Sequence, residues 1–68
     1  MIDFAKIRLA IRAKYGNEAK YAEEKEISKS KLSLILNNKI AMSFDFAEEL
    51  IKDLDIPASE IANIFFAR

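Results

Sequence analysis

Residues 18–38 read EAKYAEEKEISKSKLSLILNN, and this stretch predicts two short amphipathic helices joined by a tight polar corner. The first helix is expected over residues 18–25, with Ala19 and Ala22 on one face and Tyr21 beside them. Because Ala22 is small, the backbone of another helix can approach it closely. We expect the rest of the chain to support this pair of helices.

The second helix of this stretch is expected over residues 29–36. Ser28 precedes it, and a serine here can cap the helix by accepting a hydrogen bond from a backbone N–H one turn on. Leu32, Ile35 and Leu36 recur at helical spacing and should face the core. The outward strip is formed by Ser30, Ser33, Leu34 and Asn37, and it is flanked by Lys29 and Lys31.

The composition of this outward strip suits contact with nucleic acid. Hydroxyl and amide groups can hydrogen-bond to base edges, lysines can neutralise phosphates, and Leu34 can cover a thymine methyl group. Serine, asparagine and lysine are also what an ordinary solvated helix face carries, and single exposed leucines are common. By composition alone, both interpretations of the strip stay open.

Another helix is expected before this stretch, over residues 4–15. Asp3 can cap its start, and Gly16, the only glycine, stands where a helix end favours a left-handed residue. Asn17 can then cap the next helix, so the connection is short. The apolar stripe of this first helix consists of Phe4, Ile7 and Ile11.

A polar loop and a fourth helix should follow residue 36. Asn37, Asn38 and Lys39 close the preceding helix, because asparagine tolerates the left-handed conformation. Ser43 can cap a helix over residues 44–54. Its inward residues are expected to be Phe44, Ala47, Leu50, Ile51 and Leu54. Its acidic residues, which should face water, are Asp45, Glu48, Glu49 and Asp53.

The end of the chain is strongly apolar. Pro57 breaks the fourth helix, and a fifth short helix is expected from Ala58. Its apolar residues are Ile61, Ile64 and Phe65. Phe65 and Phe66 are candidates for a dimer interface, with core packing favoured for Phe65 and an interface for Phe66. A second copy would add stability, because a chain this short buries only about 60% of its unfolded surface.

Composition limits the possible functions. Sixty-eight residues are expected to form a single domain, residues 1–68. The chain has no Cys and no His, which argues against disulfides, thiolate or imidazole metal sites and the commonest nucleophile and base pairs. We therefore expect no enzyme activity, no catalytic or metal-binding residues and no cofactor. No apolar run approaches the roughly 20 residues that span a bilayer, and no signal-peptide core is visible. We expect a soluble cytoplasmic protein with no membrane partner.

The net charge is zero, but the charges are unevenly distributed. Residues 1–40 carry nine Lys or Arg against five acids, and residues 41–68 carry two against six. A basic region is therefore followed by an acidic one, and only the first suits an anionic partner. Within the basic region, Arg8 and Arg12 are expected on a solvated helix face. Lys14 lies near the helix end and close to Asn17, and it is a candidate for contact with phosphate.

The segments AEEKEIS (22–28), KSKLSLILNNK (29–39) and LIKDLDIP (50–57) resemble the lambda-repressor-like helix-turn-helix superfamily. More narrowly, the chain is similar to the small Cro-type and repressor-modulator proteins of temperate phages. The resemblance covers nearly the whole chain, from about residue 4 to 65. It implies an all-α, compact five-helix domain with a helix-turn-helix at helices 2 and 3. Helix 3 would lie in the major groove, and a dimer would read two half-sites roughly 34 Å apart.

The resemblance also implies roles for individual residues. The base-reading positions correspond to Lys29, Ser30, Ser33 and Leu34. The phosphate-contacting positions correspond to Asn17 and Glu18, to Asn37, Asn38 and Lys39 in the loop, and to Ser43, with Lys31 near the backbone. Lys14 and Lys20 are further candidates for the DNA backbone because of their places in this chain. Two residues differ from the usual pattern. Glu26 stands in the turn where the family usually has Gly, and Glu18 stands where it often has a phosphate-binding Gln, for which Lys20 is a possible substitute.

Two functions follow from this resemblance as hypotheses. The first is a sequence-specific DNA-binding transcriptional regulator, a Cro-like repressor that binds a palindromic operator as a homodimer formed in solution or only on DNA. It would be associated with the nucleoid of a bacterial or phage-infected cell. The alternative is a protein-binding modulator or antirepressor that docks on a partner phage repressor. The zero net charge, the outward Leu34 and the acidic fourth helix motivate this alternative.

Overall fold

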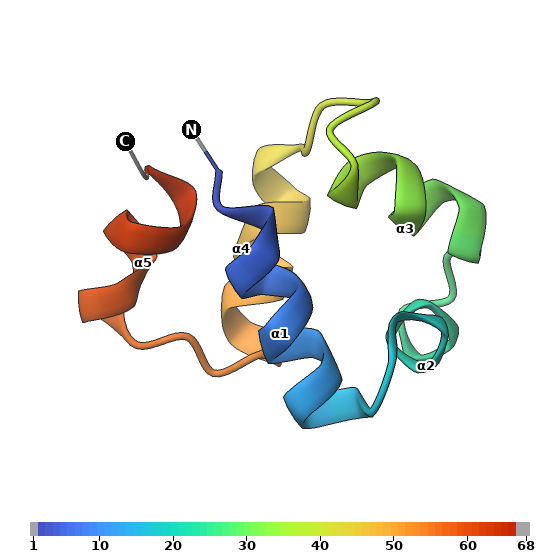
Figure 1. The fold of residues 1–68 in the computed structure, drawn as a ribbon, viewed down its shortest axis with the longest axis horizontal. Helices are drawn as coiled ribbons and strands as arrows, with labels where there is room; N and C mark the ends of the chain where they lie inside the picture. Colours follow the sequence, from blue (N-terminus) through green and yellow to red (C-terminus); the bar gives the residue numbers. More distant parts are fainter. Residues whose placement is uncertain (1, 67–68) are drawn as a thin grey trace.

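The computed structural model describes residues 2–66, and these residues form five α-helices (Figure 1). The helices are α1 (Phe4–Tyr15), α2 (Glu18–Glu24), α3 (Lys29–Leu36), α4 (Phe44–Asp53) and α5 (Ala58–Phe65). No strand occurs within these residues, so the expected all-α class is confirmed. Helices α2 and α4 each end one residue earlier than expected. The domain has a Cα radius of gyration of 11.1 Å.

Four helices begin at the side-chain caps that the sequence predicts. Oxygens of Asp3, Asn17, Ser28 and Ser43 accept hydrogen bonds from the backbone N–H three residues on, at 2.8 to 3.2 Å. Each cap satisfies one of the N–H groups that the first helical turn leaves without an intrahelical partner. The fifth helix follows Pro57 and has no side-chain cap.

Three helices end at a residue other than glycine in the left-handed conformation. Glu26, Asn38 and Asp55 follow α2, α3 and α4, with φ values of 56°, 58° and 52°. At each end, two backbone N–H groups close the last turn in the Schellman pattern, including Ile27 N to Ala22 O at 3.0 Å. The tolerance expected of Asn38 is confirmed. Glu26 occupies a conformation that costs an ordinary residue about 1–2 kcal/mol.

The core contains side chains from all five helices. Its mutually packed buried residues are Ile7, Ile11, Tyr21, Ala22, Leu32, Leu36, Leu50, Leu54, Ile64 and Phe65. Three expectations were wrong. Ala19, expected on the same face as the buried Ala22, is exposed. Tyr21, placed beside the apolar face, is fully buried. Phe44, expected in the core, is 70% exposed, because Phe46 on the opposite side of α4 packs against the core instead.

Helix α1 lies in the middle of the domain, between α5 on one side and α2 with α3 on the other (Figure 1). The start of the described chain is held against α5, since the Asp3 N–H donates a 2.6 Å hydrogen bond to the Ile64 carbonyl. This arrangement leaves the outer face of α3 uncovered by any other described helix. None of the five described helices combines the length and apolar character needed to cross a bilayer.

Candidate functional site

The outer face of α3 is exposed as the helical periodicity predicts. Leu32, Ile35 and Leu36 are buried, with exposed fractions of 4% or less. The remaining residues of the helix are all exposed, namely Lys29, Ser30, Lys31, Ser33 and Leu34. The capped N-terminus and the single buried stripe together orient this helix.

The four residues predicted to read bases line one hollow on this face. This helix-3 hollow has a volume of about 420 Å³ and is formed by Lys29, Ser30, Ser33 and Leu34. It therefore presents two hydroxyls, one ammonium group and one apolar side chain that is 44% exposed. Such a set can donate and accept hydrogen bonds and cover a methyl group. The structure brings the four residues together, and their role with bases stays a prediction.

A second hollow adjoins the first. This Arg12 hollow has a volume of about 470 Å³ and is lined by Arg12, Asn17, Glu18, Ala19 and Lys29. Lys29 lines both hollows, so they meet at the start of α3. Arg12 was expected to be only a solvated residue of α1, and its place in this hollow was missed.

Arg8, on α1, contacts both the start of α2 and the end of α3. Its Nη2 donates a 2.8 Å hydrogen bond to Asn37 Oδ1, and its Nη1 lies 3.6 Å from Glu18 Oε1. The amide Nδ2 of Asn37 in turn donates to Ser33 Oγ at 3.1 Å. The expectation that Arg8 is merely solvated was therefore wrong. The sequence did contain a sign of a shared partner, because Arg8 and Arg12 are four residues apart and so lie on one face of α1.

The end of α2 is attached to α4 by partly buried polar contacts. Lys25 Nζ lies 2.6 Å from Glu49 Oε1 and 2.9 Å from Asp53 Oδ2, and the Tyr21 hydroxyl donates to Asp53 Oδ2 at 3.0 Å. Hydrogen bonds to Glu49 and then Asp53 raise the pKa of Lys25, while burial chiefly raises that of Tyr21. Both acids were expected to face water. Asp53 is only 25% exposed and faces α2 instead, because Lys25 and Tyr21 supply its partners. Glu49 keeps a 51% exposed side chain while it contacts Lys25.

Lys14 lies apart from these hollows. Its Nζ pairs with the Asp55 carboxylate in the turn between α4 and α5. Lys14 is two residues beyond Arg12, which places it on the opposite side of α1. The position of Lys14 therefore does not support the predicted phosphate contact. That prediction relied only on the closeness of Lys14 to Asn17 along the chain.

The other residues predicted to lie near the DNA backbone are all exposed. They are Asn17, Lys20, Lys31, Asn37, Asn38, Lys39 and Ser43. They come from the start of α2, from α3 and from the loop after it. Asn17 and Ser43 already use a side-chain oxygen as helix caps. Their backbone roles on DNA stay predictions.

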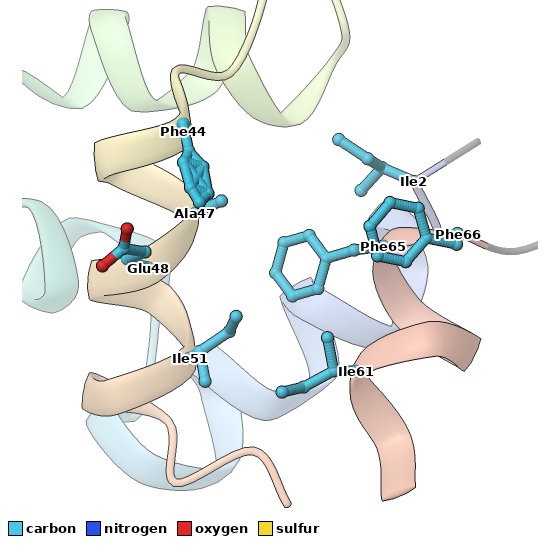
Figure 2. A pocket seen from close by; sticks show the side chains of 8 residues that line it. All are labelled: Ile2, Phe44, Ala47, Glu48, Ile51, Ile61, Phe65 and Phe66. Carbon is cyan, nitrogen blue, oxygen red and sulfur yellow. The ribbon is translucent and has the colours of Figure 1, made fainter. Parts of the chain in front are cut away.

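A separate apolar pocket lies between α4, α5 and the start of the chain (Figure 2). It has a volume of about 380 Å³ and is lined by Ile2, Phe44, Ala47, Glu48, Ile51, Ile61, Phe65 and Phe66. Figure 2 shows the carboxylate of Glu48 pointing away from the apolar lining. Phe66 is 71% exposed and Phe65 only 9%. The core packing favoured for Phe65 is confirmed, and Phe66 remains the candidate for a contact with a second copy.

No group of three acidic, His or Cys residues that could hold a metal occurs within residues 2–66. Every buried side-chain nitrogen or oxygen in that range has a hydrogen-bond partner.

A family model described as "Protein of unknown function (DUF739)" matches residues 1–68, the full length of the chain. No curated protein and no solved structure matches the chain.

Proposed function

The chain belongs to the DUF739 family, and we propose that it is a sequence-specific DNA-binding regulator of transcription. In this proposal α2 and α3 form a helix-turn-helix of the lambda-repressor-like kind, and α3 enters the major groove. No catalytic step and no cofactor are involved. The protein would act by occupying an operator and excluding polymerase or a competing regulator.

One observation supports the proposal most directly. The helix-3 hollow gathers Lys29, Ser30, Ser33 and Leu34 on a face that no described helix covers. Hydroxyl groups can bond to base edges and an exposed leucine can contact a thymine methyl group, so this face can distinguish sequences. The adjoining Arg12 hollow supplies cations from two helices beside it. Contacts of this kind position a protein on the phosphate backbone.

The test is a selection of binding sites from randomised duplexes, followed by titrations of variants on the selected site. Lys39→Ala should weaken binding to all sequences alike and reduce the salt slope by about one unit. Ser30→Ala or Ser33→Ala should instead change the preferred sequence. If no sequence is enriched, or if neither kind of variant has its effect, the proposal is wrong.

We also propose that the operator is bound by two copies paired through the pocket between α4 and α5. Phe44 and Phe66 flank this pocket and are 70% and 71% exposed, which is costly for aromatic side chains on so small a domain. Pairing about a two-fold axis would place each copy's Phe66 against the other's apolar lining. A two-fold dimer matches a palindromic operator.

The same pocket gives some support to a second candidate, a modulator that docks on a partner repressor. An apolar pocket with exposed aromatics suits a protein partner, and the zero net charge is less typical of an operator binder. Isothermal titration with DNA alone separates the two functions. Specific binding at micromolar or tighter affinity without a partner would count against the modulator.

A further inference from the structure

The Arg12 hollow contains two positively charged side chains and one carboxylate. Arg12 comes from α1 and Lys29 from α3, so the two cations reach the hollow from different helices. Glu18, from α2, brings a negative charge to the same place. A DNA phosphate entering this hollow would be attracted by two of these groups and repelled by the third.

Arg8 and Arg12 contact the Glu18 carboxylate in different ways. Arg8 Nη1 lies 3.6 Å from Oε1, and its Nη2 is hydrogen-bonded to Asn37. Arg12 Nη2 lies 3.7 Å from Oε2, and within residues 2–66 no other side-chain partner of Arg12 occurs. The Arg12 side chain is 62% exposed, against 30% for Arg8. Arg12 can therefore leave the carboxylate without losing any other side-chain contact, whereas Arg8 is also held in place by Asn37.

Building on the proposed DNA-binding function, we propose that Glu18 holds Arg12 in the unbound protein at the place where a DNA backbone phosphate binds. On binding, Arg12 exchanges the carboxylate for the phosphate, and Lys29 adds a second positive charge. Glu18 stays with Arg8. The Glu18 carboxylate thus competes with the phosphate for Arg12. An acidic residue next to the phosphate site is compatible with DNA binding in this proposal, because Arg8 continues to pair with it.

The distances favour this exchange. Charge-assisted hydrogen bonds measure about 2.7–2.9 Å, and a guanidinium can bind phosphate through two of them in parallel. The contacts of Glu18 with Arg8 and Arg12, at 3.6 and 3.7 Å, are looser than this. Arg12 therefore gains a better-matched partner on DNA. Because phosphate contacts carry no sequence information, Glu18 should weaken binding to every sequence alike.

The experiment measures fluorescence anisotropy of a duplex of roughly 20 base pairs of mixed sequence, at several salt concentrations, since phosphate contacts need no operator. Glu18→Gln should bind about three- to tenfold more tightly than wild type at low salt, because it removes a like charge close to the phosphate. Glu60→Gln, on α5, makes the same change in net charge far from the hollow. This control should differ from wild type by less than about twofold.

Arg12→Ala tests the other partner of the exchange. It should weaken binding and reduce the salt slope by about one unit. In an Arg12→Ala background, Glu18→Gln should gain clearly less than it gains in the wild-type chain. In wild-type protein, the Nε–Hε NMR signal of Arg12 should move on adding the duplex, and that of Arg8 much less.

The outcomes distinguish this inference from the function on which it rests. If wild type binds the duplex but Glu18→Gln binds no more tightly, and the Arg12 signal does not move, Glu18 is only structural and the inference is overturned. If wild type binds no duplex at all, the DNA-binding function falls and the inference falls with it. Circular dichroism confirms that each variant is folded, and the NMR measurement needs no variant.

Discussion

The Arg8 guanidinium donates a 2.8 Å hydrogen bond to the side-chain oxygen of Asn37, a residue 29 positions away. Asn37 caps the end of α3 and also donates to Ser33, one of the residues that line the helix-3 hollow. A residue of α1 therefore helps to set the position of a side chain on the exposed face of α3. Stability and the proposed recognition surface are coupled through this contact.

Replacing Arg8 should destabilise the domain. Arg8→Ala removes a charged donor from a partly exposed hydrogen bond, and we expect a loss of about 1 kcal/mol, or roughly 4–8 °C in Tm. Arg12→Ala serves as the control and should cost less than about 0.5 kcal/mol, since its side chain is mostly exposed. Urea unfolding followed by circular dichroism measures both. Equal losses in the two variants would contradict a stabilising role for the contacts of Arg8 with Asn37 and Glu18.

Relieving the left-handed conformation at the corner should stabilise the domain. Glu26 has φ +56°, and Glu26→Gly removes its steric cost while adding unfolded-state entropy. The net expected gain is about 0.5–1 kcal/mol. Asn38→Gly, at φ +58°, should gain less, because asparagine tolerates this conformation. Thermal unfolding of the two variants gives the comparison, and a lower Tm for Glu26→Gly would show that its side chain contributes more than its strain costs.

The Tyr21 phenol should make the fold sensitive to alkali. Its pKa is raised above the ordinary 10.0, mainly by burial and then by the hydrogen bond to Asp53. The folded state favours the neutral phenol, so this stability is fully present below pH 10 and is lost as pH rises above it. The expected slope is about 1.4 kcal/mol per pH unit.

Tyr21→Phe isolates this contribution. The pKa of Lys25 is also raised in the folded state by its hydrogen bonds, so its contribution to stability begins to fall above about pH 10.5, where the lysine of the unfolded chain loses its proton, in both proteins. Urea unfolding at pH values from 8 to about 11 should therefore show a shallower decline for Tyr21→Phe than for wild type. The variant should be less stable at pH 8 by about 1 kcal/mol, the worth of the lost hydrogen bond. Parallel declines would mean that the phenol ionises freely in the folded protein.

The exposed phenylalanines should govern self-association. Phe44→Ser and Phe66→Ser should each raise the dimer Kd by a factor of about five or more, as expected for an aromatic interface residue worth over about 1 kcal/mol. Leu9→Ser is the control, because Leu9 is 65% exposed on α1 and does not line the pocket. Sedimentation equilibrium, with and without operator DNA, measures the Kd. A change caused equally by Leu9→Ser would argue against an interface at this pocket.

Helix boundaries were predictable because their causes are local. The oxygens of Asp3, Asn17, Ser28 and Ser43 bond to N–H groups three residues away, so a short sequence window contains both partners. The buried stripe of α3 followed in the same way from a period of 3.6 residues. Because the stripe faces inward, the remaining residues of α3 face outward, and four of them line the helix-3 hollow. Whether those residues contact bases is a property of a complex and stays a prediction.

The errors concern residues whose surroundings depend on which helix packs beside them. Phe44 was assigned to the core because its spacing fits the stripe of α4, yet packing turns Phe46 inward instead. Arg8 and Arg12 were expected only on a solvated helix face. Their long side chains take partners from whichever helix packs beside them, and periodicity does not identify that neighbour.

The sequence by itself determined the number of helices, their capped starts and their inward stripes, because backbone hydrogen bonding and helical spacing act over a few residues. Tertiary structure alone decided the pairings of Arg8 with Asn37, Tyr21 with Asp53 and Lys14 with Asp55, which are 29, 32 and 41 positions apart. It also placed Glu18 between α1 and the start of α3. Such contacts depend on how the helices cross, and the crossing is set by the packing of all five stripes together.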